Sequence, residues 1–199
     1  MKKILFSIVV CATLLSACSP AVPNTPTVVP TSIPTSLPTE TPAPTATSAP
    51  TFVLSSSAFA NGESIPVIYT CNGKRTSPAF AWTEPPAGTQ SFALIVNDPD
   101  AGNYVHWVLY NIPATQRSLP EAVQTGQELD DGMYQGLSGG AVFGYVGPCP
   151  PSGMHHYSFT LYALDFMLKK EQGVGRNLLL DAIKGHILAQ SELIGTYKP

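Results

Sequence analysis

Short apolar runs separated by turn-forming residues are the feature that most restricts how this chain can fold. The runs are rich in β-branched and aromatic residues, and glycine, proline, asparagine and aspartate stand between them. Such runs are typical of strands, which alternate in a half-buried sheet or stay continuously apolar when both faces are covered. We therefore predict strands at residues 67–69, 80–82, 91–96, 105–112 and 157–164.

One segment near the carboxyl end has a helical pattern instead. Apolar residues recur at three- and four-residue spacing from Leu178 to Ile187, and Asn177 is a candidate N-cap. The helix is predicted to end near Gln190, before a short extended segment at residues 193–197. Many strands with one or two helices predict a mainly β fold, a sandwich with helices at its edge.

The amino-terminal quarter of the chain cannot contribute to that sandwich. Residues 19–51 consist almost wholly of proline, threonine, serine, alanine and valine, with Glu40 as the single charge. Such a tract has too few large apolar groups to bury a core and is predicted to be a disordered linker. At about 3.1 Å per residue it could reach on the order of 100 Å. Residues 52–199 are enough for one domain with its own core.

Residues 1–18 have the pattern of an export signal. Lys2 and Lys3 precede an apolar run from Ile4 to Leu15, and small residues follow just before Cys18. This order is typical of a secretory signal peptide, here residues 1–18. The cysteine at the cut point resembles a bacterial lipoprotein signal, in which Cys18 would carry a diacylglycerol. Because each buried CH2 contributes about 0.8 kcal/mol, we expect a firm membrane anchor on the extracytoplasmic face, at the cell surface or in the periplasm.

The remaining cysteines suit an oxidising compartment, and the net charge limits which molecules the protein could bind. Cys71 and Cys149 form an even pair outside the reducing cytosol, so either a disulfide or two buried thiols would fit. The formal net charge is −3, and it becomes −5 once Lys2 and Lys3 leave with the signal. The chain has no basic patch for nucleic acid, and its acidity gives no electrostatic reason to adhere to anionic lipid.

Two polar segments stand out from the apolar runs. The first holds Asp98-Pro99-Asp100 and then His106, and the second runs from Gly144 to Tyr157. Together they contain three of the four histidines beside rigid glycine- and proline-rich turns. Imidazole, phenol and backbone NH groups are donors, and converging donors suit an oxyanion such as phosphate, sulfate or carboxylate. An aspartate there is better used to fix a histidine tautomer than to face the anion.

The ordered motifs resemble the phosphatidylethanolamine-binding protein family, in its bacterial Raf-kinase-inhibitor-like branch. The resemblance covers about residues 53–198. It rests on Asp98-Pro99-Asp100, His106-Trp107, Gly147 through Pro151 and His155-x-Tyr157, with flanking matches at Tyr69–Gly73 and Gly195–Tyr197. It implies a sandwich of two antiparallel sheets with peripheral α-helices and a small anion-binding cavity at one end.

The resemblance also implies the residues of that cavity. They would be Asp98, His106, His155 and Tyr157, with Pro150 and Pro151 shaping the wall and Gly147 allowing close backbone approach. His156 should point the opposite way along its strand and is left out of the site. Only Ala-Gly-Asn-Tyr-Val separates Asp100 from His106, fewer residues than in longer relatives, so ligand preference does not carry over.

Other readings of these residues are weaker. Trp107 is expected to be core, and His186 is expected on the apolar side of the helix. Gly136-Leu137-Ser138-Gly139-Gly140 fits G-x-S-x-G, with Asp165 and His186 following, but that elbow needs a helix after the serine and an α/β fold around it. Two histidines and an aspartate could ligate a metal, yet the mix with a phenol suits an anion at least as well.

We therefore expect a non-catalytic binding protein without a cofactor or metal. Its ligand would be a phosphoryl or other small anionic group, with a phospholipid head group among the candidates. The alternative is a protein-interaction module, such as the protease or kinase inhibitors among some relatives, although a kinase is not expected outside the cytoplasm. Loss of Asp98 and His155 would abolish anion binding but leave such inhibition in place.

Overall fold

The computed structural model describes residues 51–170 and 175–199. The predicted signal at residues 1–18, its lipidation site Cys18 and all of the linker except Thr51 lie outside these described residues. None of the helices in the described ranges is both long and apolar enough to cross a membrane.

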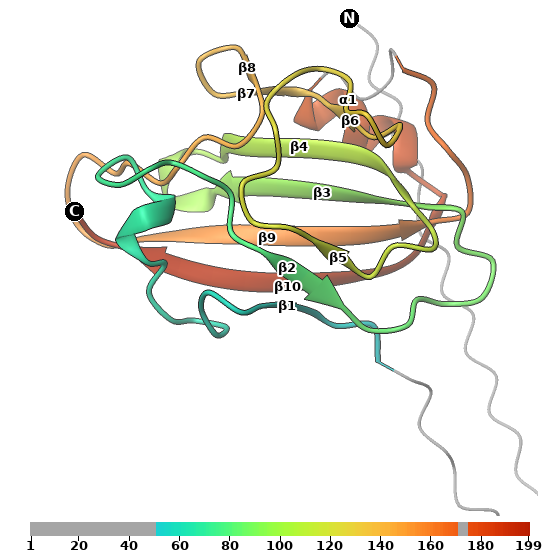
Figure 1. The fold of residues 1–199 in the computed structure, drawn as a ribbon, viewed down its shortest axis with the longest axis horizontal. Helices are drawn as coiled ribbons and strands as arrows, with labels where there is room; N and C mark the ends of the chain where they lie inside the picture. The colour runs from blue at the N-terminus through green and yellow to red at the C-terminus, as the bar shows by residue number, and fades with distance from the viewer. Residues whose placement is uncertain (1–50, 171–174) are drawn as a thin grey trace, which may run out of the picture. The chain divides into compact units, whose positions relative to one another are not determined.

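The described residues form mostly strands (Figure 1). The strands are β1 (Leu54–Ser56), β2 (Phe80–Trp82), β3 (Ser91–Asp98), β4 (Tyr104–Pro113), β5 (Ser118–Leu119), β6 (Tyr134–Gln135), β7 (Leu137–Ser138), β8 (Val142–Phe143), β9 (His155–Leu164) and β10 (Ile187–Tyr197). The helices are the α-helix α1 (Arg176–Ile183) and the 3-10 helices η1 (Val67–Tyr69) and η2 (Pro99–Ala101).

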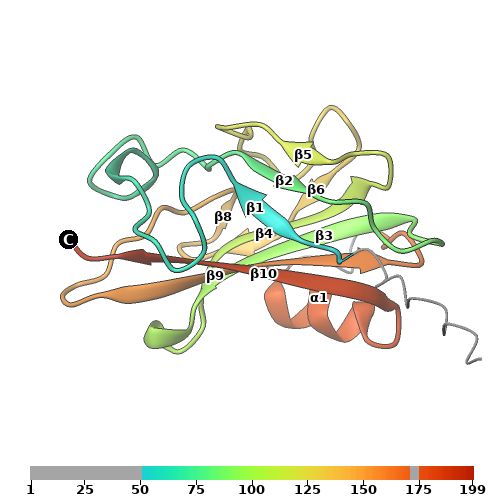
Figure 2. The same cartoon turned by 90° about the horizontal axis from the view of Figure 1, so that it is seen from below.

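The strands build two facing antiparallel sheets, as predicted. The larger sheet has five strands in the order β10-β9-β3-β4-β6, and the smaller has three in the order β1-β2-β5. Strands β7 and β8 form a separate two-stranded hairpin. Figure 2 shows the smaller sheet on one side of the larger sheet and α1 on the other. The prediction of a mainly β sandwich with a peripheral helix is confirmed.

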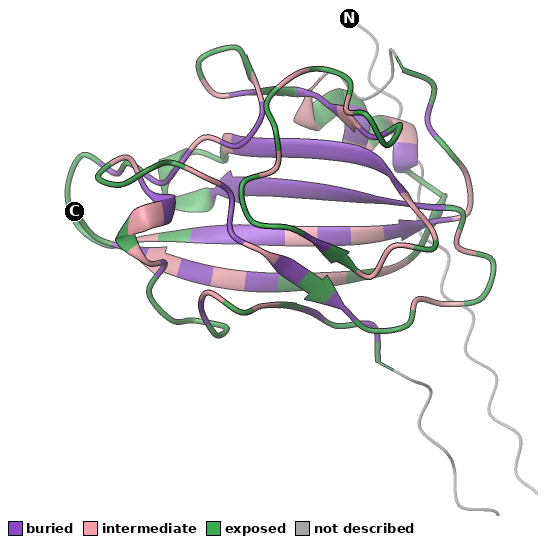
Figure 3. Ribbon diagram, viewed as in Figure 1, coloured by how far each residue is buried: buried purple, intermediate pink, exposed green. Residues whose placement is uncertain are grey.

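Each face of the larger sheet has its own apolar core. Phe80 and Trp82 of the smaller sheet pack with Phe92, Trp107 and Phe159 of the larger sheet in the main core. The other face has a smaller core, in which side chains of β3, β4 and β9 pack against α1. Strand β3 is therefore buried along its whole length, which explains its continuously apolar run (Figure 3).

Residues 67–69 are not the predicted strand. They form η1, in which the Tyr69 and Thr70 amides donate to the carbonyls of Pro66 and Val67. A Cβ on Gly73 would lie 2.1 Å from the Val67 carbonyl oxygen, so the chain folds back tightly on this turn. The β-branched composition of three residues predicted a strand, but the surrounding proline and glycine favour the turn.

The helix begins two residues before the predicted start and ends earlier than predicted. Its N-cap is Gly175 rather than Asn177, and it ends at Ile183 rather than near Gln190. Gly185, with φ of +85°, lets the chain reverse, and residues 187–197 then pair along β9 as the edge strand β10. Pairing of β10 with β9 thus overrides the helical periodicity that continues into its first residue, Ile187.

The expected place of His186 on the helix is accordingly wrong. His186 follows α1, where its half-exposed ring packs against Phe166 with 4.3 Å between ring centroids. Its Nδ1 lies 2.8 Å from Oδ1 of Asp165.

A covalent link joins η1 to the loop that precedes β9. Cys71 and Cys149 form a disulfide across 78 residues of sequence. Two hydrogen bonds run beside it, from the Cys71 amide to the Pro148 carbonyl at 2.9 Å and from the Tyr145 hydroxyl to the Tyr69 carbonyl at 3.1 Å. The structure thereby selects the disulfide over two buried thiols, and the link holds the loop at residues 145–151 in place.

The disulfide gives a first prediction. Because a link across so long a loop restricts the unfolded chain, the double change Cys71→Ser and Cys149→Ser should lower the free energy of unfolding by about 2–4 kcal/mol. Urea denaturation measures that loss. Peptide mapping without reductant should recover the Cys71 and Cys149 peptides as one covalent pair, and free thiols at both positions would contradict the structure.

Candidate functional site

A cavity of about 250 Å³ opens at the end of the sandwich where β3 ends and where β4 and β9 begin. All seven residues predicted for the anion site line it; they are Asp98, His106, Gly147, Pro150, Pro151, His155 and Tyr157. The structure thus brings together residues that lie up to 59 positions apart, from Asp98 to Tyr157. Their role in binding stays a prediction.

Sheet order explains why these side chains meet. Strands β9, β3 and β4 are consecutive neighbours, and each of them has an end at the cavity. Antiparallel registers place Asp98 opposite Tyr104 of β4 and Asn97 opposite Ser158 of β9. Since alternate residues of a strand share a face, His155 and Tyr157 lie on one side of β9 and His156 on the other.

Asp98 and His155 form a hydrogen-bonded pair at the floor of the cavity. His155 Nδ1 lies 2.7 Å from Asp98 Oδ2, and the aspartate side chain is almost wholly buried. The other oxygen, Oδ1, accepts from the Ala101 amide at 3.0 Å and so caps η2. Because an ionised carboxylate only accepts, His155 donates through Nδ1 and leaves Nε2 for a ligand. The predicted role of Asp98 in fixing a histidine tautomer agrees with this geometry.

His106 forms two hydrogen bonds with a single residue, Val146. Its Nδ1 lies 2.7 Å from the Val146 carbonyl oxygen, while the Val146 amide donates to the His106 carbonyl at 2.8 Å. Burial lowers the pKa of His106 below its ordinary value, against smaller raising effects of the Val146 carbonyl and of Asp98. A neutral imidazole that donates through Nδ1 can only accept through Nε2. At neutral pH, His106 in this tautomer offers an acceptor, whereas the sequence predicted a donor at this position.

Tyr157 supplies the donor. Its side chain is fully buried, and its ring meets the His106 ring edge-on at 5.1 Å. Its hydroxyl lies close to Asp98 but forms no hydrogen bond of ordinary geometry with any of the described residues. Burial raises the pKa of Tyr157, and the charges of Asp98 and Asp100 and a hydrogen-bonding contribution from Asp98 raise it further, so the phenol keeps its proton. A buried hydroxyl without a partner costs about 1–3 kcal/mol, and a ligand oxygen would recover that cost.

The loop before β9 forms the remaining wall. Pro150 and Pro151 line the cavity as predicted, together with Cys149 of the disulfide. Gly147 also lines it, but a Cβ there would lie 2.7 Å from the Tyr69 carbonyl oxygen. Glycine is therefore required so that the wall can approach the backbone of Tyr69 and Thr70 closely.

Besides Cys149, which was predicted only as a possible disulfide partner, three lining residues were not predicted, namely Ala101, Tyr104 and Val146. Tyr104 lies two residues before His106 on β4 and hence on the same face, which is a signal that sequence alone contains. Its ring rests on Gly139, where a Cβ would lie 2.0 Å from it, and meets the His106 ring at 5.1 Å. Val146 acts through its backbone, so its side-chain type held no comparable signal.

Residues expected outside the site are outside it. His156 is half exposed and does not line the cavity; its amide and Nδ1 lie 2.7 Å and 2.8 Å from Asp100 Oδ2. The His156 amide, followed by its side chain, lowers the pKa of Asp100. Trp107 is fully buried in the main core and donates to Gln135 Oε1 at 2.6 Å.

The G-x-S-x-G motif does not form a nucleophile elbow. Ser138 is buried and donates to the Gly144 carbonyl at 2.7 Å. It lies in β7 and pairs with Val142 of β8, so a hairpin stands where the elbow would need a helix. Asp165 and His186 bond to each other. Within residues 51–170 and 175–199, no group of three or more histidine, cysteine, aspartate or glutamate side chains is arranged to hold a metal ion.

The cavity therefore offers a phenol donor, an imidazole acceptor and an aspartate-backed imidazole within a rigid wall. This set is complementary to an oxyanion that carries one proton, because such a group can accept from Tyr157 and donate to His106. Monohydrogen phosphate and the monoanion of a phosphate monoester have groups of this kind, whereas sulfate and the dianion of a monoester have no proton to donate.

The orphaned hydroxyl of Tyr157 can be tested by stability. Without ligand, Tyr157→Phe should raise the free energy of unfolding by about 1 kcal/mol, because it removes a buried donor that forms no hydrogen bond of ordinary geometry with the described residues. Tyr145→Phe is the matched control, since the Tyr145 hydroxyl donates to Tyr69 and its loss should cost about 1 kcal/mol. Urea denaturation measures the change in the free energy of unfolding for each variant. Equal destabilisation by the two changes would contradict the view that the Tyr157 hydroxyl lacks a hydrogen bond.

Comparison with known proteins agrees with this fold. The family model described as phosphatidylethanolamine-binding protein matches residues 55–198. A UPF0098 protein of Methanothermobacter thermautotrophicus is 44% identical over 147 residues, which cover 73% of this chain and 97% of that protein. A UPF0098 protein of Aquifex aeolicus is 44% identical over 148 residues, covering 72% of this chain and 86% of the relative.

Two solved structures are similar throughout the described domain. A phosphatidylethanolamine-binding protein homologue from Chlamydia trachomatis has a TM-score of 0.68 and 39% identity, covering 74% of this chain and 97% of its own. YbcL of E. coli has a TM-score of 0.68 and 30% identity, covering 74% of this chain and 98% of its own. With the model match and these identities, the chain belongs to the phosphatidylethanolamine-binding protein family.

Proposed function

We propose that this protein binds a phosphate or phosphoryl group in the cavity at the end of the sandwich and does not catalyse a reaction. The observation that carries the proposal is the buried hydroxyl of Tyr157, which lines the same cavity as neutral His106 and forms no hydrogen bond of ordinary geometry with the described residues. The Asp98–His155 pair supports it with a second oriented imidazole.

The source of the phosphoryl group and the cellular location are parts of the same proposal. A phospholipid head group is one source, in keeping with the family description, and a soluble phosphate monoester is another. Because the phosphodiester of a phospholipid carries no acidic proton, an ammonium group of that head group would donate to His106 instead. We place the domain outside the cytoplasm, anchored through a lipid on Cys18 and separated from the membrane by the linker at residues 19–51. Peptide mass spectrometry of the membrane-extracted protein tests the anchor, and an unmodified Cys18 would contradict it.

NMR titration of the full chain with inorganic phosphate, phosphoethanolamine and phosphoserine tests the pocket. Saturable shifts should appear at His106, His155 and Tyr157. His155→Ala should weaken phosphate binding at least tenfold, because it removes the imidazole that Asp98 orients. His186→Ala is the matched control, since it removes another aspartate-paired imidazole that does not line the cavity. Shifts elsewhere only, or shifts that survive His155→Ala unchanged, would refute the pocket.

The protonation state of His106 predicts selectivity that depends on pH. Because burial lowers its pKa, His106 stays an acceptor at pH 7.5, so phosphate should bind more tightly than sulfate there. When the pH falls through the lowered pKa, the imidazolium becomes a donor and sulfate affinity should rise, by up to about tenfold per pH unit for one proton. Calorimetric titration from pH 7.5 to 5.5 measures this gain, and His106→Gln should flatten it. A sulfate affinity that decreases as the pH is lowered would contradict the assignment of His106 as an acceptor at pH 7.5.

A further inference from the structure

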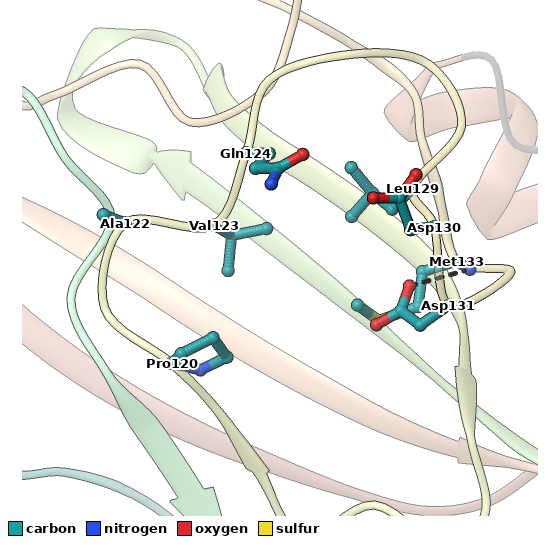
Figure 4. Close-up of a pocket in the computed structure, with 8 residues that line it drawn as sticks. All are labelled: Pro120, Ala122, Val123, Gln124, Leu129, Asp130, Asp131 and Met133. Atoms are coloured by element: carbon teal, nitrogen blue, oxygen red, sulfur yellow. Dashed lines mark hydrogen bonds between the residues drawn. The ribbon is translucent and has the colours of Figure 1, made fainter.

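A second cavity, of about 290 Å³, lies in the loop between β5 and β6. Two arms of this loop form its sides, with Pro120 and Val123 on one arm and Leu129, Asp131 and Met133 on the other (Figure 4). No residue lines both this cavity and the one that contains Tyr157. The cavity is therefore a separate groove, and its analysis does not depend on phosphate binding.

The floor of the groove is apolar and continuous with the protein core. Met133 is buried in the main core, and Val123 and Leu129 are half-buried and pack against it. An aliphatic ligand in the groove would thus extend the core outward. Because aliphatic surface gains by leaving water, these three side chains favour an aliphatic group over a polar one.

Both arms are held by hydrogen bonds that do not depend on what fills the groove. The amides of Ala122 and Val123 donate to Ser77, to its carbonyl at 2.9 Å and to its hydroxyl at 3.0 Å. The Leu129 amide donates to the Met133 carbonyl at 2.9 Å, and Gln135 Nε2 reaches the Gln124 carbonyl at 2.8 Å. The groove is preformed, so a ligand need not order the loop when it binds.

The rim of the groove is acidic. Residues 118–168 contain no lysine or arginine, whereas the loop at 120–133 contains four carboxylates. Lys170 neutralises Glu128, and Glu121 accepts from the Tyr69 hydroxyl. Neither Asp130 nor Asp131 forms an ion pair with any residue in the part of the chain that the structure describes; Asp131 Oδ1 only accepts weakly from the Met133 amide at 3.4 Å. The rim is therefore complementary to a cation.

We propose that this groove, formed by Pro120, Val123, Leu129, Met133, Asp130 and Asp131, docks a lysine side chain of a protein partner. Ligand pockets usually occupy roughly 300–1,000 Å³, so a cavity at the lower end suits one side chain better than a whole small molecule. Lysine buries its aliphatic stem on apolar surface and keeps its ammonium group in water. Here the stem lies on the apolar floor and the ammonium group lies between the two exposed carboxylates.

Titration of the full chain with n-butylammonium, which reproduces the lysine side chain, tests the proposal. Methyl NMR signals of Val123, Leu129 and Met133 should shift saturably. The apparent Kd should be at least tenfold lower than for n-butanol, which lacks the charge, for butyrate, which reverses it, and for methylammonium, which lacks the stem. Equal shifts by butylammonium and butanol would show a purely apolar groove, and no shift at these methyl groups would refute the site.

Two variants separate the rim from the rest of the acidic surface. Asp130→Asn with Asp131→Asn should raise the Kd of butylammonium at least threefold while the methyl spectrum keeps its folded dispersion. Glu63→Gln is the matched control, because it removes an exposed carboxylate that does not line the groove. If both variants weaken binding equally, the effect is general attraction to an acidic protein, and the proposal is wrong.

Short peptides test whether the lysine belongs to a polypeptide. Acetyl-Gly-Lys-Gly-amide should shift the three methyl groups, whereas the same peptide with norleucine should not. An arginine peptide that binds more tightly than the lysine peptide would overturn the choice of lysine. Since the groove and the phosphate cavity share no lining residue, saturation with phosphate should leave these shifts unchanged. If butylammonium binds but phosphate does not, the proposed phosphate cavity is refuted and the groove is not.

Discussion

Antiparallel pairing of β9 with β3, and of β3 with β4, is the constraint on which the site depends. It sets three buried central strands side by side, each with an end at one edge of the sandwich. Asp98, His106 and His155 come from three different strands and meet only because those registers are fixed. Apolar burial on both faces of β3 specifies the register, since a slip by one residue would exchange the two faces.

Some features of the polar site lower the stability of the unliganded protein. The fully buried hydroxyl of Tyr157 forms no ordinary hydrogen bond within the described part of the chain, and burial holds His106 neutral beside an aspartate. Such features cost free energy in the unliganded protein and are typical of functional sites. The disulfide and the hydrogen bonds beside it hold the wall at residues 145–151 in place. The resulting pocket is preorganised for a small ligand rather than one that closes around it.

Sequence patterns predicted the strands and the site residues because both depend on local order and motif spacing. They failed where three-dimensional pairing decides: residues 67–69 turn into η1, and residues beyond Ile183 leave the helix to pair with β9. Sequence named His106 but could not show that Val146 fixes its tautomer, because Val146 acts through its backbone. It also missed the groove at residues 120–133, whose apolar and acidic members read singly as ordinary loop residues.

The central claim is that Tyr157 and His106 together recognise a protonated oxyanion. A crystal structure of the chain with bound phosphate at neutral pH measures this most directly. The account predicts one phosphate oxygen at about 2.5–3.0 Å from the Tyr157 hydroxyl and a second within hydrogen-bonding distance of His106 Nε2. Phosphate bound elsewhere, or bound in the cavity without contact to Tyr157, would contradict it.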